Sequence, residues 1–127
     1  MDDVYPGWDG LADAVPLLVR QVLEPLAQGR PAGHRRWDWT GHRWAEQVPV
    51  PAVDVLVVEG VGCGSRAAAP HLSALVWVEA DEPVRMARGV DRDGEAYRPH
   101  WERWALQERA LFAAEGTRER ADVVLTT

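Results

Sequence analysis

The chain has 127 residues, a formal net charge of −6 at pH 7 and a pI near 5.1. This length suits one domain over residues 1–127, and the acidic balance argues against a nucleic-acid partner or an anionic membrane surface. Cys63 is the sole cysteine, which excludes an internal disulfide and favours a cytoplasmic protein. No apolar run is long enough to span a bilayer, so we expect no membrane association.

The first element predicted along the chain is a helix. Apolar residues recur at helical spacing over residues 10–28, with Gly29 directly after them and Asp9 as the candidate N-cap. A turn follows at residues 29–33, and residues 35–39 form a short strand or an extended loop.

The remaining elements alternate between strands and helices. The β-branched run at residues 53–58 is typical of a strand buried on both faces of a parallel sheet, and residues 75–78 predict a second buried strand. Helices are expected at residues 81–93 and 99–115, followed by a last strand at residues 121–125. This order predicts an α/β fold with a small parallel sheet flanked by helices.

Four local patterns suggest a relationship to a known family. The segment Asp2-Asp3-Val4-Tyr5 is similar to a D-x-[FY]-Y motif, and residues 37–42 are similar to a Y-D-F-x-x-H motif in which Trp37 replaces the tyrosine. Residues 55–60 resemble a Walker-B-like strand that ends in Glu-Gly. Three arginines fall where phosphate-binding lid arginines occur: Arg85, Arg88 and Arg92.

In this order the patterns resemble the uridine kinase-like branch of the P-loop nucleoside kinases, over nearly the whole chain. The resemblance implies a partial P-loop-kinase-like three-layer fold. A phosphate-binding loop requires a glycine-rich turn and a lysine, but this sequence has neither the loop nor any lysine. We therefore expect the first central strand and its loop to be missing. Unpaired strand edges bind other strands, so the edges left open by the missing strand predict a homodimer.

Two carboxylates are the catalytic candidates. The resemblance implies Asp2 as a general base, and it implies Tyr5 as a substrate contact. Glu59 follows a predicted buried strand and precedes a glycine, and ligands bind at the carboxyl ends of strands in open α/β sheets. A cap on the following turn is the alternative role for Glu59, and fraying at the terminus is the alternative for Asp2.

An aromatic and polar cluster supplies further substrate-binding candidates: Trp37, Asp38, Trp39 and His42, with Trp44 nearby. The tryptophans would stack on a flat substrate, or they belong to a strand and pack on the first helix. No second ligand lies at metal spacing from His42, so we expect no metal site. The three lid-like arginines form a phosphate or carboxylate clamp, or a solvated helix face.

Three functions are consistent with these features. The first is ATP-independent acid/base chemistry on a small aromatic metabolite, with or without a phosphate group, such as a condensation or cyclisation in specialised metabolism; it needs no cofactor. The second is a phosphotransferase whose phosphate loop is encoded upstream of a misplaced start, which would use Mg²⁺ and ATP. The third is a non-catalytic ligand-binding module.

Overall fold

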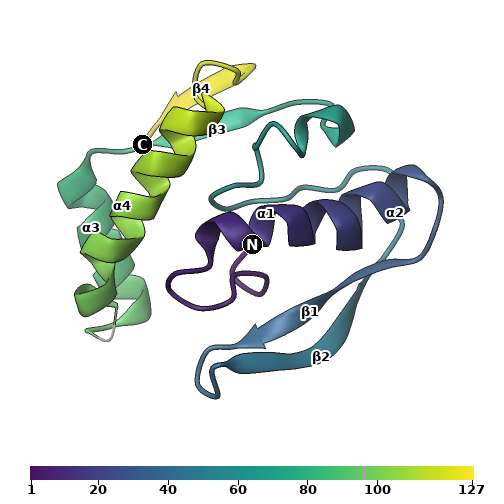
Figure 1. Cartoon of the computed structure of the whole chain (residues 1–127). Helices are drawn as coiled ribbons and strands as arrows, with labels where there is room; N and C mark the ends of the chain where they lie inside the picture. Colours follow the sequence, from purple (N-terminus) through teal and green to yellow (C-terminus); the bar gives the residue numbers. More distant parts are fainter. Residues whose placement is uncertain (96) are drawn as a thin grey trace. The chain divides into compact units, whose positions relative to one another are not determined.

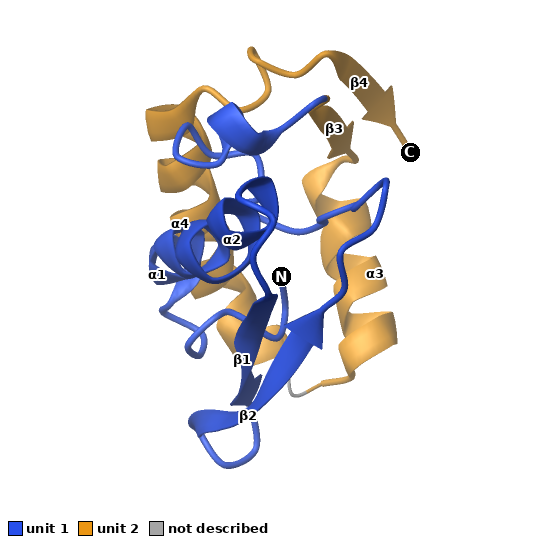
Figure 2. Ribbon diagram, turned by 90° about the vertical axis from the view of Figure 1, so that its right-hand side faces the viewer, with its two compact units in different colours: residues 1–73 blue, residues 74–127 orange. Residues whose placement is uncertain are grey.

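The computed structural model describes residues 1–95 and 97–127, which form two compact units, Met1–Ser73 and Ala74–Thr127 (Figures 1 and 2). The class is mixed α/β, with one two-stranded sheet in each unit. The single domain expected over residues 1–127 stays a prediction, since compactness alone does not test whether the units fold independently. In the described residues, no helix is long and apolar enough to cross a membrane.

The first unit contains the helix predicted at residues 10–28. It is made of α1 (Leu11–Leu18), a π-helical turn (Val19–Leu23) and α2 (Glu24–Ala27), which follow one another along one axis (Figure 1). The wider turn directly precedes Pro25, which has no N–H and whose ring crowds the carbonyl four residues earlier. The π turn therefore relieves a clash that a regular helix would suffer.

The expected N-cap is wrong. Gly10 occupies the cap position, and no side chain makes a cap hydrogen bond there. The prediction of a helix end at Gly29 is confirmed, because this glycine has a φ of +65°, a backbone conformation that favours glycine.

A β-hairpin follows the helix. Strand β1 (Ala32–Asp38) pairs antiparallel with β2 (Arg43–Val50), so residues 35–38 form a strand. The turn between the strands includes His42 at a φ of +49°. The hairpin strand β2 was not predicted, because apolar and polar residues do not alternate regularly over residues 43–50.

The prediction of a buried strand at residues 53–58 is wrong. The segment is irregular and carries no strand pairing, and Val55 and Val57 are 78% and 81% exposed. A buried parallel strand needs neighbours that satisfy its backbone groups on both sides. Within the described part of the chain no strand pairs with this segment, and its apolar side chains stay largely exposed, except for Val58, which packs partly against the core.

The core of the first unit forms around the end of the helix. Its buried members are Leu18, Val19, Val22, Leu23 and Ala68. Partly buried side chains from the hairpin and the following loops pack against them, among them Val50, Val58 and Cys63. Burial raises the pKa of the Cys63 thiol, which suits a spacer and not a nucleophile.

The second unit contains the later predicted elements: β3 (Val76–Glu79), α3 (Glu82–Asp93), α4 (Arg98–Glu115) and β4 (Val123–Thr126). β3 and β4 pair in parallel, with Val76 opposite Val123, which confirms a small parallel sheet. The prediction that the strand at residues 75–78 is buried is wrong, because Val76 and Val78 are half exposed. The finer kinase-like three-layer arrangement stays a prediction.

Side chains connect strand β3 to α4 and to the turn that follows α4. Trp77 contacts Phe112 edge-on, with ring centroids 4.6 Å apart. Glu79 accepts hydrogen bonds from Arg118 at 2.8 and 3.1 Å and from the Trp77 indole at 2.7 Å. The hydrogen bonds from Arg118, followed by that from Trp77, lower the pKa of Glu79 to about 2.

Candidate functional site

The N-terminal turn is fastened to the loop at residues 59–61. The Met1 amine donates to the Glu59 carbonyl at 3.0 Å, and the Tyr5 hydroxyl donates to the Val61 carbonyl at 2.9 Å. Tyr5 is only 2% exposed. The side chain expected to contact substrate is thus buried and holds two distant segments together.

Gly60 makes this close approach possible. It has a φ of +119°, and a Cβ there would lie 2.6 Å from the Met1 Cβ and 3.0 Å from the Tyr5 hydroxyl. Any other residue would be strained and would push the N-terminal turn away. The glycine therefore sets the position of Glu59 relative to the turn that contains Asp2.

The end of β1 holds the other side of the same turn. The Trp37 amide donates to the Asp3 carbonyl at 2.7 Å, and the Trp39 indole donates to the Asp2 carbonyl at 3.1 Å. The backbone at Asp2 and Asp3 is thus held by hydrogen bonds, and the two carboxylates project from an anchored turn.

A cavity of about 350 Å³ opens to solvent between this turn, the helix, the hairpin and residues 56–59. Its apolar wall comes from the helix, β2, the N-terminal turn and the 53–58 segment: Leu18, Val22, Val50, Val4, Leu56, Val57 and Val58, together with Met1. Its polar residues are Asp2, Asp3, His34 and Glu59. Both predicted catalytic residues, which lie far apart in the sequence, therefore line one cavity.

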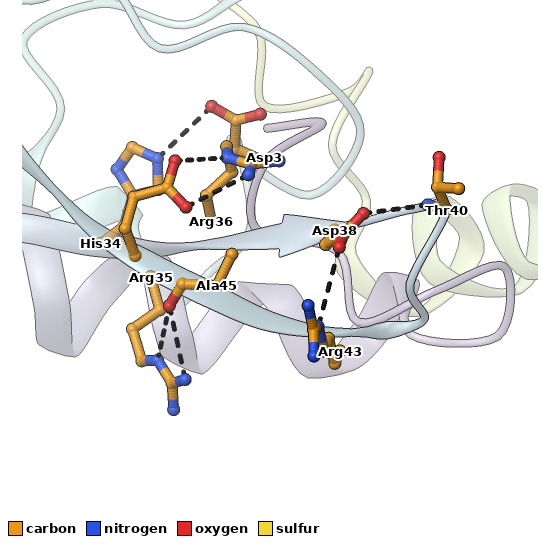
Figure 3. Close-up of polar contacts among 9 residues, drawn as sticks. Asp3, His34, Arg35, Arg36, Asp38, Thr40, Arg43 and Ala45 are labelled. Atoms are coloured by element: carbon orange, nitrogen blue, oxygen red, sulfur yellow. Dashed lines mark hydrogen bonds and ion pairs between the residues drawn. The ribbon is translucent and has the colours of Figure 1, made fainter.

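The cavity carries negative charge. His34 lies 3.6 Å from Asp3 (Figure 3), while the Asp2 and Glu59 carboxylates make no ion pair within the described residues. None of the lining residues is an arginine. The Nε2 atom of His34 is buried without a hydrogen-bond partner among the described atoms. This environment favours a ligand that brings positive charge or hydrogen-bond donors.

Across residues 1–95 and 97–127, no group of three or more His, Cys, Asp or Glu side chains lies close enough together to hold a metal ion. The expectation that there is no metal site stays a prediction.

The predicted aromatic cluster lies on the hairpin and does not line the cavity. Trp37 packs edge-on against Trp44 with centroids 5.1 Å apart, and Trp39 packs against Trp8 at 4.9 Å. His42 is an exposed turn residue. The tryptophans thus pack on one another and on the N-terminal segment, and substrate contact by them stays a prediction.

Asp38 organises the hairpin turn. Its carboxylate accepts hydrogen bonds from the Thr40 and Gly41 amides at 3.1 and 3.0 Å, and it lies 3.8 Å from Arg43 (Figure 3). The bond from Gly41, above all, lowers the pKa of Asp38. Its observed partners belong to the turn, so nothing in the structure directs it to a ligand.

The three lid-like arginines lie on α3, and each has a partner within the second unit. Arg85 pairs with Glu108 at 2.9 Å, and Arg88 donates to the Thr127 hydroxyl at 2.9 Å. Arg92 makes two hydrogen bonds to the adjacent Asp93, at 2.9 and 2.7 Å. Their side chains are spread over separate partners, and a common phosphate clamp stays a prediction.

Two polar lining residues, Asp3 and His34, were not among the predicted site residues. Asp3 was visible only as the neighbour of Asp2, and the sequence did not indicate that both would reach one cavity. His34 lies on β1, and a strand prediction over residues 32–38 would have placed it on the same face as Arg36.

No family model matches the chain, and no curated protein matches it. The relationship to the uridine kinase-like branch therefore stays a proposal, and the site is interpreted from its own geometry.

Proposed function

We propose that this protein binds a small metabolite in the cavity of the first unit, and that Glu59 and Asp2 perform ATP-independent acid/base chemistry on it. The observation that carries this proposal is that Asp2 and Glu59 both line one cavity with an apolar wall. A pocket of a few apolar side chains with a small number of polar groups is the usual form of a small-molecule site.

The charge of the lining favours a cationic or donor-rich ligand. The lining has three carboxylic acid residues and one histidine, and the Met1 ammonium, which donates to the Glu59 carbonyl, offsets only one negative charge. A phosphate or carboxylate ligand would therefore meet a net negative lining with no arginine in it. An amine with an apolar body would place its ammonium between the carboxylates and its body against Leu18, Val22 and Val50. The size of the cavity suits a ligand of this kind.

The two carboxylates would divide the proton transfers. One accepts a proton from the bound molecule as general base, and the other, once protonated, returns a proton to the product as general acid. The chain thereby needs no nucleotide for this chemistry. A condensation or cyclisation requires this pair of transfers.

Ligand binding by single-charge variants tests the proposal. Phenethylamine, 3-phenylpropionate and phenyl phosphate share an aromatic body and differ in charge, so calorimetry with each gives the charge preference. We expect the amine to bind best, and Glu59→Gln or Asp2→Asn to weaken its binding roughly tenfold or more, as loss of a charge-assisted hydrogen bond costs about 1.5–3 kcal/mol. Asp13→Asn, which removes an exposed carboxylate outside the cavity, is the matched control. Amine binding that all three variants leave unchanged would refute the proposal.

One observation favours the phosphotransferase alternative. The 53–58 segment has the composition of a strand but is irregular and has no strand partner within the described residues, as expected of a sheet that lacks a strand. An in-frame glycine-rich phosphate loop in the DNA upstream of Met1, together with Mg²⁺-dependent ATP binding by the longer chain, would support this function. ATP binding followed by tryptophan fluorescence separates it from the acid/base proposal.

A further inference from the structure

His34 brings an unpaired polar atom to the wall of the cavity. Its side chain is only 14% exposed, and its Nε2 atom is buried with no hydrogen-bond partner among the described residues. The Asp3 carboxylate lies 3.6 Å from this atom, which is too long for a hydrogen bond (Figure 3). Buried polar groups without a partner are destabilising and therefore rare in native proteins, so this one calls for a role.

Asp3 combines an anchored backbone with a side chain that can move. Its carbonyl accepts a hydrogen bond from the Trp37 amide at 2.7 Å, which holds the N-terminal turn against β1. Its side chain is 56% exposed, so the carboxylate can rotate to another staggered position while the backbone stays in place. A proton on Nε2 of His34 faces this carboxylate favourably, which makes Nε2 the donor and the carboxylate the acceptor.

We propose that His34 and Asp3 together bind a hydroxyl group of the ligand, so that the cavity takes an amine that also carries a hydroxyl. The inference rests on the proposed function, which places the ammonium of the ligand among the carboxylates of the cavity. A hydroxyl both accepts and donates a hydrogen bond. Its oxygen accepts the hydrogen bond from Nε2 of His34, and its own hydrogen bonds to the Asp3 carboxylate.

A small movement of one side chain is enough to admit the hydroxyl. Hydrogen bonds of about 2.9 Å from Nε2 and about 2.7 Å to the carboxylate hold these two outer atoms about 4.5 Å apart around a hydroxyl oxygen. The observed 3.6 Å must therefore increase by about 1 Å, which rotation of the exposed Asp3 side chain supplies. His34 stays in place, because its backbone belongs to β1 and lies opposite Val48 in the hairpin.

Other polar groups satisfy this pair less well. A carbonyl or ether oxygen accepts from Nε2 of His34 but has no hydrogen for the Asp3 carboxylate. A second ammonium donates to Asp3 but offers no acceptor to Nε2, and a carboxylate meets like charge at Asp3. A direct hydrogen bond between the two side chains is the purely structural alternative, and it predicts no preference for a hydroxyl-bearing ligand.

Amines that differ by one hydroxyl test the inference. Phenethylamine, 2-amino-1-phenylethanol and tyramine share an ammonium and an aromatic body; the second has a hydroxyl beside the ammonium, and the third has one at the far end. In calorimetry with the 127-residue chain, we expect one of the two hydroxyl-bearing amines to bind about tenfold more tightly than phenethylamine. His34→Phe keeps a planar ring without Nε2, so it should abolish this gain and leave phenethylamine binding unchanged within about twofold.

Three further variants complete the set. His34→Gln keeps an amide donor near the position of Nε2 and should retain part of the gain. His34→Val, a residue that favours strands, makes the same test as His34→Phe if the larger ring disturbs the fold. His71→Phe is the matched control, because it makes the same substitution outside the cavity lining. Circular dichroism checks the fold of each variant.

The outcomes separate this inference from the proposed function. If neither hydroxyl-bearing amine binds more tightly than phenethylamine, the inference is overturned. The proposed function then still stands, provided that Glu59→Gln and Asp2→Asn weaken phenethylamine binding. A gain that persists in folded His34→Phe or His34→Val also overturns the inference, because the hydroxyl must then contact another group. If none of the three amines binds, both the inference and the proposed function are overturned.

Discussion

Replacing either Leu11 or Leu18 by alanine tests whether the cavity exists in solution. Both leucines are buried in the first unit, with 0% and 3% of their surface exposed, but only Leu18 lines the cavity. Each substitution removes three carbon groups, which costs about 2.4 kcal/mol of transfer free energy. A closed void left behind adds about 24 cal/mol per Å³, and such losses reach about 5 kcal/mol in total.

The two variants should therefore differ. At Leu11 the void has no route to solvent along the cavity, so we expect a loss of about 4 kcal/mol in the free energy of unfolding. At Leu18 the space joins a cavity that is open to solvent, so the void contribution falls and the loss should be about 2.5 kcal/mol. Urea unfolding followed by tryptophan fluorescence measures both values, with the slopes compared to check two-state behaviour. An equal or larger loss for Leu18→Ala would refute the open cavity.

Three further predictions concern polar groups. The lowered pKa of Glu79 means that its contribution to the stability of the second unit is complete above its ordinary value of 4.5 and is lost as the pH falls towards about 2. Acid titration of near-ultraviolet circular dichroism should show this loss, and Glu79→Gln should reduce its dependence on pH. The raised pKa of Cys63 predicts slow reaction with a thiol reagent at pH 8, and the ordinary rate only after unfolding in urea. Asp38→Ala should speed amide hydrogen exchange at Thr40 and Gly41, whereas unchanged exchange would contradict its role in the turn.

Local sequence patterns predicted the helices and the last two strands, and failed at residues 53–58 for a physical reason. The helices at residues 10–28, 81–93 and 99–115 follow from periodicity, glycine and proline, which act over a few neighbouring residues. The 53–58 run has strand composition, but a strand exists only where a second strand satisfies its backbone groups. Composition cannot show whether that partner is present. The hairpin was predicted only in part. Residues 35–39 were expected to form a strand or an extended loop, and the tryptophans to stack on a substrate or to lie on a strand packed against the first helix, but no partner strand was predicted.

Only part of the site could be predicted from the sequence. Glu59 was singled out by its place before Gly60, and Asp2 by the family resemblance; the structure places both along one cavity. That Asp3 and His34 join them depends on long-range hydrogen bonds, such as the one from the Trp37 amide to the Asp3 carbonyl. No local pattern encodes such a contact. The arginines and the hairpin tryptophans resembled site residues because they share the chemistry of a site, but their observed partners lie within their own units.

Mapping where a cationic ligand binds tests the central claim most directly. Titration of the ¹⁵N-labelled chain with phenethylamine should shift the backbone amides that line the cavity, those of Asp2, Val22, His34 and Glu59. Phenyl phosphate at the same concentrations should leave them unchanged. Shifts confined to α3 around Arg85, Arg88 and Arg92, or phosphate binding stronger than amine binding, would contradict the proposed site.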